Sequence, residues 1–213
     1  MALAYDGAIK VYKVAGMGPY NNNGYVLADP ASRECYLVDA PAEVGKLIEE
    51  AKAFQVKGVL ITHAHPDHIA GYAELKRATR LPVGVHANDE ARLPEPAAFH
   101  LAPGELLHIG QTPIRVLHTP GHTPGGVCLF MDGYLISGDT LFPGGPGYTR
   151  SADGFQQVVA SITEQLHILD ERVVVLPGHG ANTTIGESMR EYSIFAAKPH
   201  PVDLHGEIHW LTS

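Results

Sequence analysis

Apolar and polar residues alternate in short runs through the first sixty positions, and turns rich in Gly, Asn and Pro separate the runs. This pattern predicts three β-strands, over residues 9–14, 24–28 and 34–39. Apolar residues then recur at intervals of three and four, which predicts an amphipathic helix over residues 42–54. A continuous apolar run over residues 56–61 predicts the next strand, which we expect to be buried.

The rest of the chain repeats this alternation of strands and helices. Helices are expected over residues 71–79, 88–93, 153–169 and 187–197, and Asp153 is the expected N-cap of the third of them. Strands are expected over residues 82–86, 106–109, 114–118, 126–130, 134–137 and 173–176. Two segments rich in Pro, Gly or Ala, 94–103 and 142–154, are expected to be loops.

The order of these elements is strands, helices, strands, helices, which favours an α+β fold. Two such halves can stack sheet on sheet with the helices outside, as a four-layer αββα sandwich. No low-complexity linker divides the 213 residues, so we expect a single domain over residues 1–213. A chain of this length buries roughly 70% of its unfolded surface and needs no disulfides. Cys35 and Cys128 lie in apolar, strand-like contexts and are expected to be small core residues.

Charge and the terminal sequence exclude several classes of partner. Net charge is −8 with histidines neutral, and the 15 Lys and Arg residues form no basic run. Nucleic acid and anionic membranes are therefore not expected as partners. The N-terminus has no basic segment followed by a long apolar core, and no window is long enough to span a membrane, which predicts a soluble cytoplasmic protein.

Histidines cluster directly after the strand predicted over residues 56–61. The sequence T-H-A-H-P-D-H places His63, His65, Asp67 and His68 within six residues. A lone histidine at a strand end is usually capped or solvated, but four nitrogen and oxygen donors at one strand end are difficult to explain by packing. The cluster therefore indicates a metal site.

Three more donors share one arrangement, in which an apolar strand ends in a turn containing Gly or Pro. They are His122 in H-T-P-G-H, Asp139 in S-G-D and His179 in L-P-G-H. Rigid strands commonly position the loop residues of functional sites in this way. Seven donors exceed the four that one tetrahedral metal takes, so two divalent metals sharing a carboxylate fit better. Imidazole and carboxylate suit zinc, which we expect first, and also iron or manganese. The other histidines match no second ligand set and are expected to be structural or surface residues: His86, His100, His108, His118, His167, His200, His205 and His209.

The motifs H-A-H-P-D-H, P-G-H-T-P-G, S-G-D-T-L-F and L-P-G-H-G resemble, in this order, those of the metallo-β-lactamase-fold hydrolases. Within them the chain looks most like the compact glyoxalase II-like (hydroxyacylglutathione hydrolase-like) proteins. The resemblance covers residues 9–186 and implies the αββα sandwich. The ligand set that it implies is His63, His65 and His122 for one metal, Asp67, His68 and His179 for the other, and Asp139 as the bridge. It also implies that Asp39 supports the histidine loop, although turn capping accounts for Asp39 nearly as well.

The resemblance implies a binuclear hydrolase in which a metal-bridging hydroxide attacks an ester-like carbonyl, most readily a thioester. We expect a small acyl substrate and leave monomer and homodimer open. Asp67 and Asp139 are the expected catalytic residues, and Tyr148 is a candidate donor to the oxyanion.

The chain departs from larger glyoxalase II enzymes in two places. Those enzymes carry a C-terminal helical domain, and a basic residue in the loop after the bridging aspartate. Here that loop reads F-P-G-G-P-G-Y-T-R, which leaves Arg150 or Lys198 to meet an anionic substrate unless both are ordinary solvated residues. The loop over residues 142–154 is a candidate pocket wall or lid.

Several other functions compete with this interpretation. The β-lactamases that resemble the chain carry Cys or Ser in place of Asp139. An iron persulfide dioxygenase needs one iron, for which His63, His122 and Asp139 form a two-histidine, one-carboxylate set, but its R-G-C-G-R-T-D-F loop is matched only in part. An N-acyl-homoserine lactonase shares nearly the same ligands and stays open. Net charge −8 argues against a nuclease, and the full set of seven ligands argues against a non-enzymatic binding protein.

Overall fold

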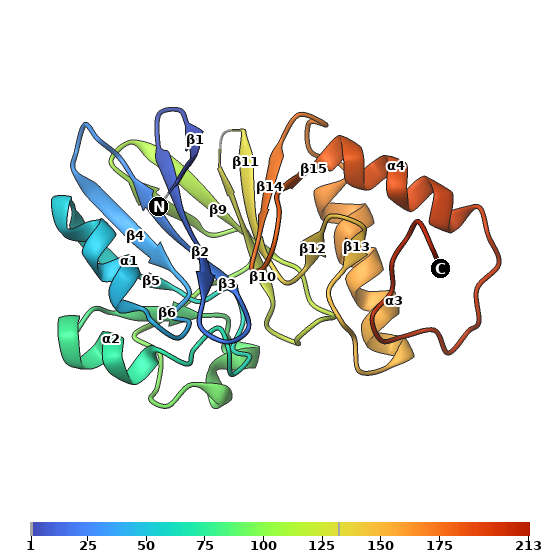
Figure 1. Ribbon diagram of the computed structural model, residues 1–213, viewed down its shortest axis with the longest axis horizontal. Helices are drawn as coiled ribbons and strands as arrows, with labels where there is room; N and C mark the ends of the chain where they lie inside the picture. The colour runs from blue at the N-terminus through green and yellow to red at the C-terminus, as the bar shows by residue number, and fades with distance from the viewer. Residues whose placement is uncertain (1, 132) are drawn as a thin grey trace.

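The computed structural model describes residues 2–131 and 133–213. Within these residues two β-sheets stack face to face, and helices cover their outer sides (Figure 1). The strands of the first sheet, in spatial order, are β1 (Ala2–Asp6), β2 (Lys10–Met17), β3 (Asn22–Ala28), β4 (Glu34–Val38), β5 (Gln55–Leu60), β6 (Val83–Val85) and β7 (Phe99–His100). The strands of the second sheet, in spatial order, are β15 (Thr183–Thr184), β14 (Val174–Pro177), β11 (Tyr134–Gly138), β10 (Val127–Met131), β9 (Thr112–His118) and β8 (Leu106–Ile109).

Helices α1 (Gly45–Glu50) and α2 (Tyr72–Thr79) lie on the outer side of the first sheet, and α3 (Ala152–Ser161) and α4 (Ile185–Ala196) lie on the outer side of the second (Figure 1). Short helical segments complete the outer layers. They are the 3₁₀ segments η1 (Ala51–Ala53) and η2 (Ala87–Arg92), and the π segment η3 (Ile162–Leu166). A small separate pair, β12 (Leu141–Phe142) and β13 (Gly145–Pro146), lies in the segment that leads to α3.

Three apolar layers hold the sandwich together, one at each interface between its four layers. Successive side chains of a strand point to opposite faces, so one strand contributes to two layers. In β3, Val26 packs with Leu47 of α1, whereas Leu27 packs between the sheets with Leu129. The third layer joins the second sheet to α3 and α4 through residues such as Val175 and Val158. This is the predicted αββα sandwich.

Strand direction brings the predicted ligand loops to one edge. β4 and β5 are parallel, so Asp39 and the histidine cluster follow neighbouring strand ends. In the second sheet β9 and β11 are each antiparallel to β10, and β11 is parallel to β14. The loops after β9, β11 and β14 therefore leave the sheet at the same edge.

Several predicted boundaries were wrong. The N-cap of α3 is Ser151, whose hydroxyl accepts a hydrogen bond from the Gly154 N–H at 3.1 Å, and Asp153 lies in the first turn instead. The first helix begins at Gly45 rather than at residue 42, because Glu43 has a φ of +64°, which a right-handed helix excludes. The final helix begins at Ile185, where the Thr184 hydroxyl accepts from the Glu187 N–H at 3.1 Å. The segment 142–154, expected as a loop, contains β13 and the start of α3.

Cys35 and Cys128 are buried core residues, as predicted. Among the helices of the described residues, none is long and apolar enough to cross a bilayer.

Candidate metal centre

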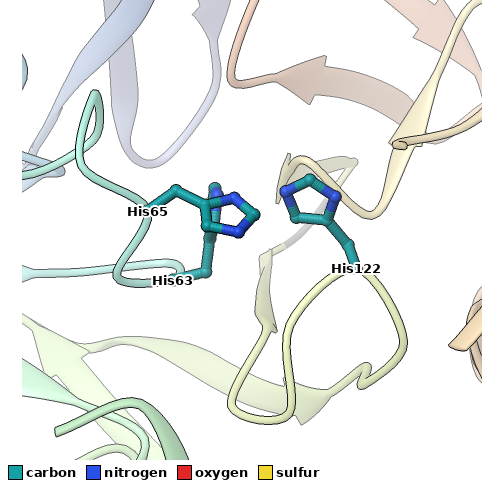
Figure 2. A group of neighbouring side chains, drawn as sticks. All are labelled: His63, His65 and His122. Atoms are coloured by element: carbon teal, nitrogen blue, oxygen red, sulfur yellow. The ribbon is translucent and has the colours of Figure 1, made fainter. Parts of the chain in front are cut away.

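All seven predicted ligands lie together where the strand ends of the two sheets meet. His63, His65, Asp67 and His68 follow β5, and the other three follow the second sheet: His122 after β9, Asp139 after β11 and His179 after β14. The rings of His63 and His65 extend from one loop and the ring of His122 from another, and they converge on a common point (Figure 2). Residues far apart in the sequence therefore form one cluster.

Donor atoms of this cluster fall into overlapping groups whose members lie within 4.8 Å of one another. The two groups that match the sets implied by the resemblance are His63, His65 and His122, and Asp67, His68 and His179. We call them the first and the second triad. The carboxylate of Asp139 lies between them, with Oδ2 3.6 Å from His122 Nε2 and Oδ1 3.3 Å from His68 Nε2.

Hydrogen bonds outside the cluster orient the imidazoles. His68 Nδ1 donates to Asp39 Oδ2 at 2.8 Å, His122 Nδ1 donates to the main-chain oxygen of Tyr148 at 2.7 Å, and His179 Nδ1 donates to that of Tyr20 at 2.9 Å. A neutral imidazole with a proton on Nδ1 has its lone pair on Nε2, which here faces the cluster. Contacts of this kind are typical of histidines that bind metals.

Three buried polar atoms of the cluster have no hydrogen-bond partner among the described residues: His63 Nε2, His122 Nε2 and Asp139 Oδ1. Leaving buried polar atoms unsatisfied costs free energy, and such atoms are rare in folded proteins. A cation coordinated by these atoms removes that cost. The donor set of this cluster therefore fits divalent metal ions.

Electrostatics divides the cluster into neutral imidazoles and charged pairs. Burial, and after it the charge of His122, lowers the pKa of His65 to about 4, and burial lowers the pKa of His63 well below its usual range. Burial alone raises the pKa of Asp139, but the charge of His68 and the hydrogen bond with His179 outweigh it, so the net pKa of Asp139 lies below its usual range. The centre thus concentrates carboxylate charge that protons on His68 and His179, or metal cations, neutralise.

Asp39 supports the histidine loop from the neighbouring strand end. Its Oδ1 accepts from the Thr62 N–H at 2.7 Å, and its Oδ2 accepts from His68 Nδ1 at 2.8 Å. Asp39 is buried and has a φ of +62°, a region that Asp and Asn tolerate better than most residues. These contacts favour the supporting role of Asp39 over turn capping alone.

We expect Asp39→Asn to weaken metal binding by about 10–100-fold, because the charged acceptor for His68 Nδ1 is lost while the backbone conformation is kept. Competition with a chromophoric chelator measures this affinity. The matched control is Asp29→Asn, which alters a carboxylate that accepts from the Ala31 N–H, outside the cluster. Equal metal affinities for the two variants would contradict the assigned role.

Two supporting residues were not predicted. Asp89 of η2 is fully buried, and it accepts from the Ala64 N–H and from the Gly125 N–H, both at 2.9 Å. It thereby ties the loop of His63 and His65 to the loop of His122. Asn22 donates its side-chain N–H to Asp67 Oδ2 at 2.8 Å and so orients the carboxylate of the second triad. An asparagine at the start of a strand and an aspartate in a short helix are too common to signal such roles.

Gly178 allows the last ligand loop to approach the cluster. A Cβ at this position would lie 2.2 Å from Asp139 Oδ1 and 2.6 Å from His68 Cε1. Any larger residue would displace groups of both sheets. The glycine before His179 is therefore required by close approach.

A cavity of about 620 Å³ opens beside the cluster. His122, Asp139 and His179 form its inner end, and its walls come from the segment 142–148 and from residues 207–209. Tyr148, the candidate oxyanion donor, lines this cavity and is 54% exposed. The segment 142–154 thus provides a pocket wall, one of the two roles expected for it.

The C-terminal segment makes the other wall. Thr149 and Gly206 exchange two main-chain hydrogen bonds of 3.0 Å, and the Trp210 N–H donates to the Gly144 oxygen at 2.8 Å. His209, expected at the surface, is exposed and also lines this cavity.

Other expected residues lie outside the cluster. His118 stacks on His86, with ring centroids 4.0 Å apart, and donates from Nε2 to the Pro124 oxygen at 3.0 Å, which agrees with a structural role. Lys198 donates to the Ser213 oxygen at 2.9 Å. Arg150 lies close to the cluster and lines a cavity that also contains His65 and His122.

Curated relatives share sequence over most of the chain. A protein of Aquifex aeolicus is 33% identical over 208 residues, which cover 88% of this chain and 98% of that protein. The probable metallo-hydrolase YqgX of Bacillus subtilis is 33% identical over 191 residues, 79% of this chain and 90% of that protein. A hydroxyacylglutathione hydrolase of Cereibacter sphaeroides is 33% identical over 163 residues, 75% of this chain but only 62% of that enzyme.

Several solved structures also match this chain over most of its length. The B3 metallo-β-lactamase BLEG-1 superposes with a TM-score of 0.76 at 30% identity, over 84% of this chain and 96% of that one. ETHE1 from Myxococcus xanthus gives 0.75 at 27% identity, over 88% and 86%. The di-iron-bound form of TTHA1623 gives 0.72 at 29% identity, over 84% and 97%. A family model described as the metallo-beta-lactamase superfamily matches residues 17–179, so the chain belongs to that superfamily.

Proposed function

We propose that this chain is a two-metal hydrolase that cleaves an ester-like carbonyl, and that its substrate is a small thioester. The observation that carries the proposal is the position of Asp139. Its Oδ2 lies 3.6 Å from Nε2 of His122 in the first triad and 3.5 Å from Nε2 of His179 in the second. One carboxylate thus faces both triads, as a bridge between two cations requires.

The donor set and the relatives support this proposal. Five imidazoles and two carboxylates suit zinc, which we propose first, or iron or manganese. When bound, two such cations supply a water of lowered pKa as the nucleophile and polarise the substrate carbonyl. One relative is a probable metallo-hydrolase, another is a hydroxyacylglutathione hydrolase, and TTHA1623 binds two irons in a similar fold.

Hydrogen bonds from the imidazoles to other protein groups fix the orientation of the rings at this site. Asp39, Tyr148 and Tyr20 accept from the Nδ1 atoms of three histidines, so Nε2 of each ring points inward. The hydroxyl of Tyr148, at the cavity wall, is the proposed donor to the substrate oxygen that gains negative charge. Because a thiolate leaves readily, the mechanism requires no general acid.

Net charge −8 supports a small-molecule substrate rather than nucleic acid or an anionic membrane. We propose that the enzyme works in the cytoplasm as one domain, in a monomer or a homodimer.

A second candidate is an iron-dependent persulfide dioxygenase. In the set expected from the sequence, Asp139 Oδ2 lies 3.9 Å from His63 Nε2 and 3.6 Å from His122 Nε2. His63, His68 and Asp139 form another two-histidine, one-carboxylate group, with donor atoms within 4.8 Å of one another, and sets of this type hold one iron in oxygenases. The similarity to ETHE1 from Myxococcus xanthus is compatible with this candidate. A lactonase differs from the main proposal only in its substrate, because the attack on the carbonyl is the same.

Metal content combined with a substrate panel tests the proposal. The metals per chain are counted by mass spectrometry, and the loaded protein is assayed with S-D-lactoylglutathione, simple thioesters, a lactone and a persulfide with O₂. We expect two metals and thioester hydrolysis. Two bound metals without turnover of any thioester would refute the main proposal, and one iron with O₂ consumption would favour the dioxygenase.

A further inference from the structure

Two arginines lie beside the first triad, in cavities that Tyr148 does not line. Arg92 and Arg150 both line two neighbouring cavities of about 460 Å³ each, and His65 lines both as well. His122 also lines one of them. The two guanidinium groups therefore flank a space that adjoins the candidate metal centre.

The fold holds both arginines in place through buried neighbours. Arg92 ends η2, which the buried carboxylate of Asp89 ties to the two loops of the first triad. Arg150 follows Thr149, whose main chain pairs with Gly206, and it precedes Ser151, the N-cap of α3. The backbone that carries each guanidinium is thus anchored, while both side chains are exposed.

Neither arginine has a protein partner within the described residues, in which no ion pair or side-chain hydrogen bond involves Arg92 or Arg150. Asp153 lines one of the two cavities, so the side chains around the pair carry a net positive charge. The N-terminus of α3 adds partial positive charge at the same place. Arginine is well suited to binding an anion, because its planar guanidinium group binds a carboxylate or a phosphate through two hydrogen bonds.

The cavity that Tyr148 lines differs in the polarity of its walls. Its walls include Phe142, Pro143, Pro146 and Ile208, and the acidic side chains that line it are Glu207 and, at the metal centre, Asp139. This cavity favours an apolar group and disfavours an anion. The centre therefore adjoins both an apolar cavity and a cationic one.

We propose that Arg92 and Arg150 form an anion subsite, and that the substrate is a thioester with one apolar arm and one arm that ends in an anionic group. The inference rests on the proposed function for the bond that is cleaved, but the binding of the anion is a separate property. The anionic group can belong to the thiol arm or to the acyl arm, and the experiment distinguishes the two.

Four thioesters of similar size test the subsite by steady-state kinetics. S-butyryl-3-mercaptopropionate carries a carboxylate on the thiol arm, S-propyl monothiosuccinate carries it on the acyl arm, S-propyl thiobutyrate is neutral, and butyrylthiocholine is cationic. We expect kcat/KM of at least one anionic thioester to exceed that of the neutral one by about tenfold. The double variant Arg92→Gln/Arg150→Gln should abolish this preference. Arg77→Gln, an exposed arginine on α2 that lines neither cavity, should retain it.

Binding of thioethers separates the subsite from the hydrolysis. Calorimetry with the metal-loaded protein compares 3-(butylthio)propanoate with the trimethylammonium analogue, neither of which contains a cleavable carbonyl. We expect the anion to bind about tenfold more tightly, and only while both arginines are present. If no thioester is hydrolysed but this preference holds, the proposed function fails and the subsite stands. Equal binding of both thioethers, or an anion preference that survives in the double variant, would overturn the inference.

Discussion

Asp139→Asn is expected to lower kcat/KM for thioester hydrolysis by about a thousandfold or more. The carboxylate of Asp139 lies within 4 Å of an Nε2 atom in four imidazoles, those of His63, His68, His122 and His179. The substitution removes the negative charge and directs an amide N–H₂ group toward positions that cations would occupy. We therefore expect metal content to fall together with the rate.

Asp203→Asn is a matched control for this experiment, because it makes the same chemical change on an exposed side chain. Mass spectrometry should find fewer metals in Asp139→Asn than in the control, and both should have wild-type circular dichroism. A fully loaded and fully active Asp139→Asn protein would contradict the bridging role.

Removal of the metals is expected to lower Tm by roughly 10 °C. A ligand present at a thousand times its Kd stabilises the folded state by about 4 kcal/mol, and each kcal/mol shifts Tm by about 2–4 °C in a protein of this size. The effect should be large here because His63 Nε2, His122 Nε2 and Asp139 Oδ1 are buried without a hydrogen-bond partner in the described residues. When the cations leave, these buried atoms have no coordinating partner, which costs free energy in the folded state.

Differential scanning calorimetry before and after dialysis against a chelator measures the shift, and stoichiometric Zn²⁺ or Fe²⁺ should restore Tm. In Asp139→Asn the same treatment should shift Tm much less, because that variant is expected to bind less metal. An unchanged Tm in the wild-type protein after verified metal removal would show that cations do not stabilise the fold.

The clustering of the seven candidate ligands was predictable from the sequence, because they follow apolar strands, and strands with the same direction end at the same edge of a sheet. His122, Asp139 and His179 are separated by many residues, yet the directions of β9, β11 and β14 bring them together. The αββα layers were predictable for a related reason, since alternating burial assigns each strand residue to one of two faces. The periodicity of apolar residues along the chain therefore predicts both the layers of the sandwich and the sheet edge at which the candidate ligands lie.

Residues that support the ligands were not predictable, because their roles depend on contacts between distant segments. Asn22 begins a strand and Asp89 lies in a short helix, and neither position indicates a role until the fold places them beside Asp67 and the two loops of the first triad. The cap of α3 illustrates the same difficulty. Ser and Asp are both residue types that cap helices well. Ser151 is the N-cap in the structure, and it lies two residues after Thr149, which pairs with Gly206.

The pairing of Thr149 with Gly206 and of Trp210 with Gly144 has an evolutionary consequence. These bonds use main-chain atoms only, so they place no demand on the side chains of Glu207 and His209, which are exposed and line the cavity, whereas Ile208 between them is a buried core residue. Substitutions at these two positions would reshape the cavity wall without changing any candidate metal ligand. One wall of the cavity can therefore vary in sequence independently of the seven candidate ligands, all of which precede residue 180.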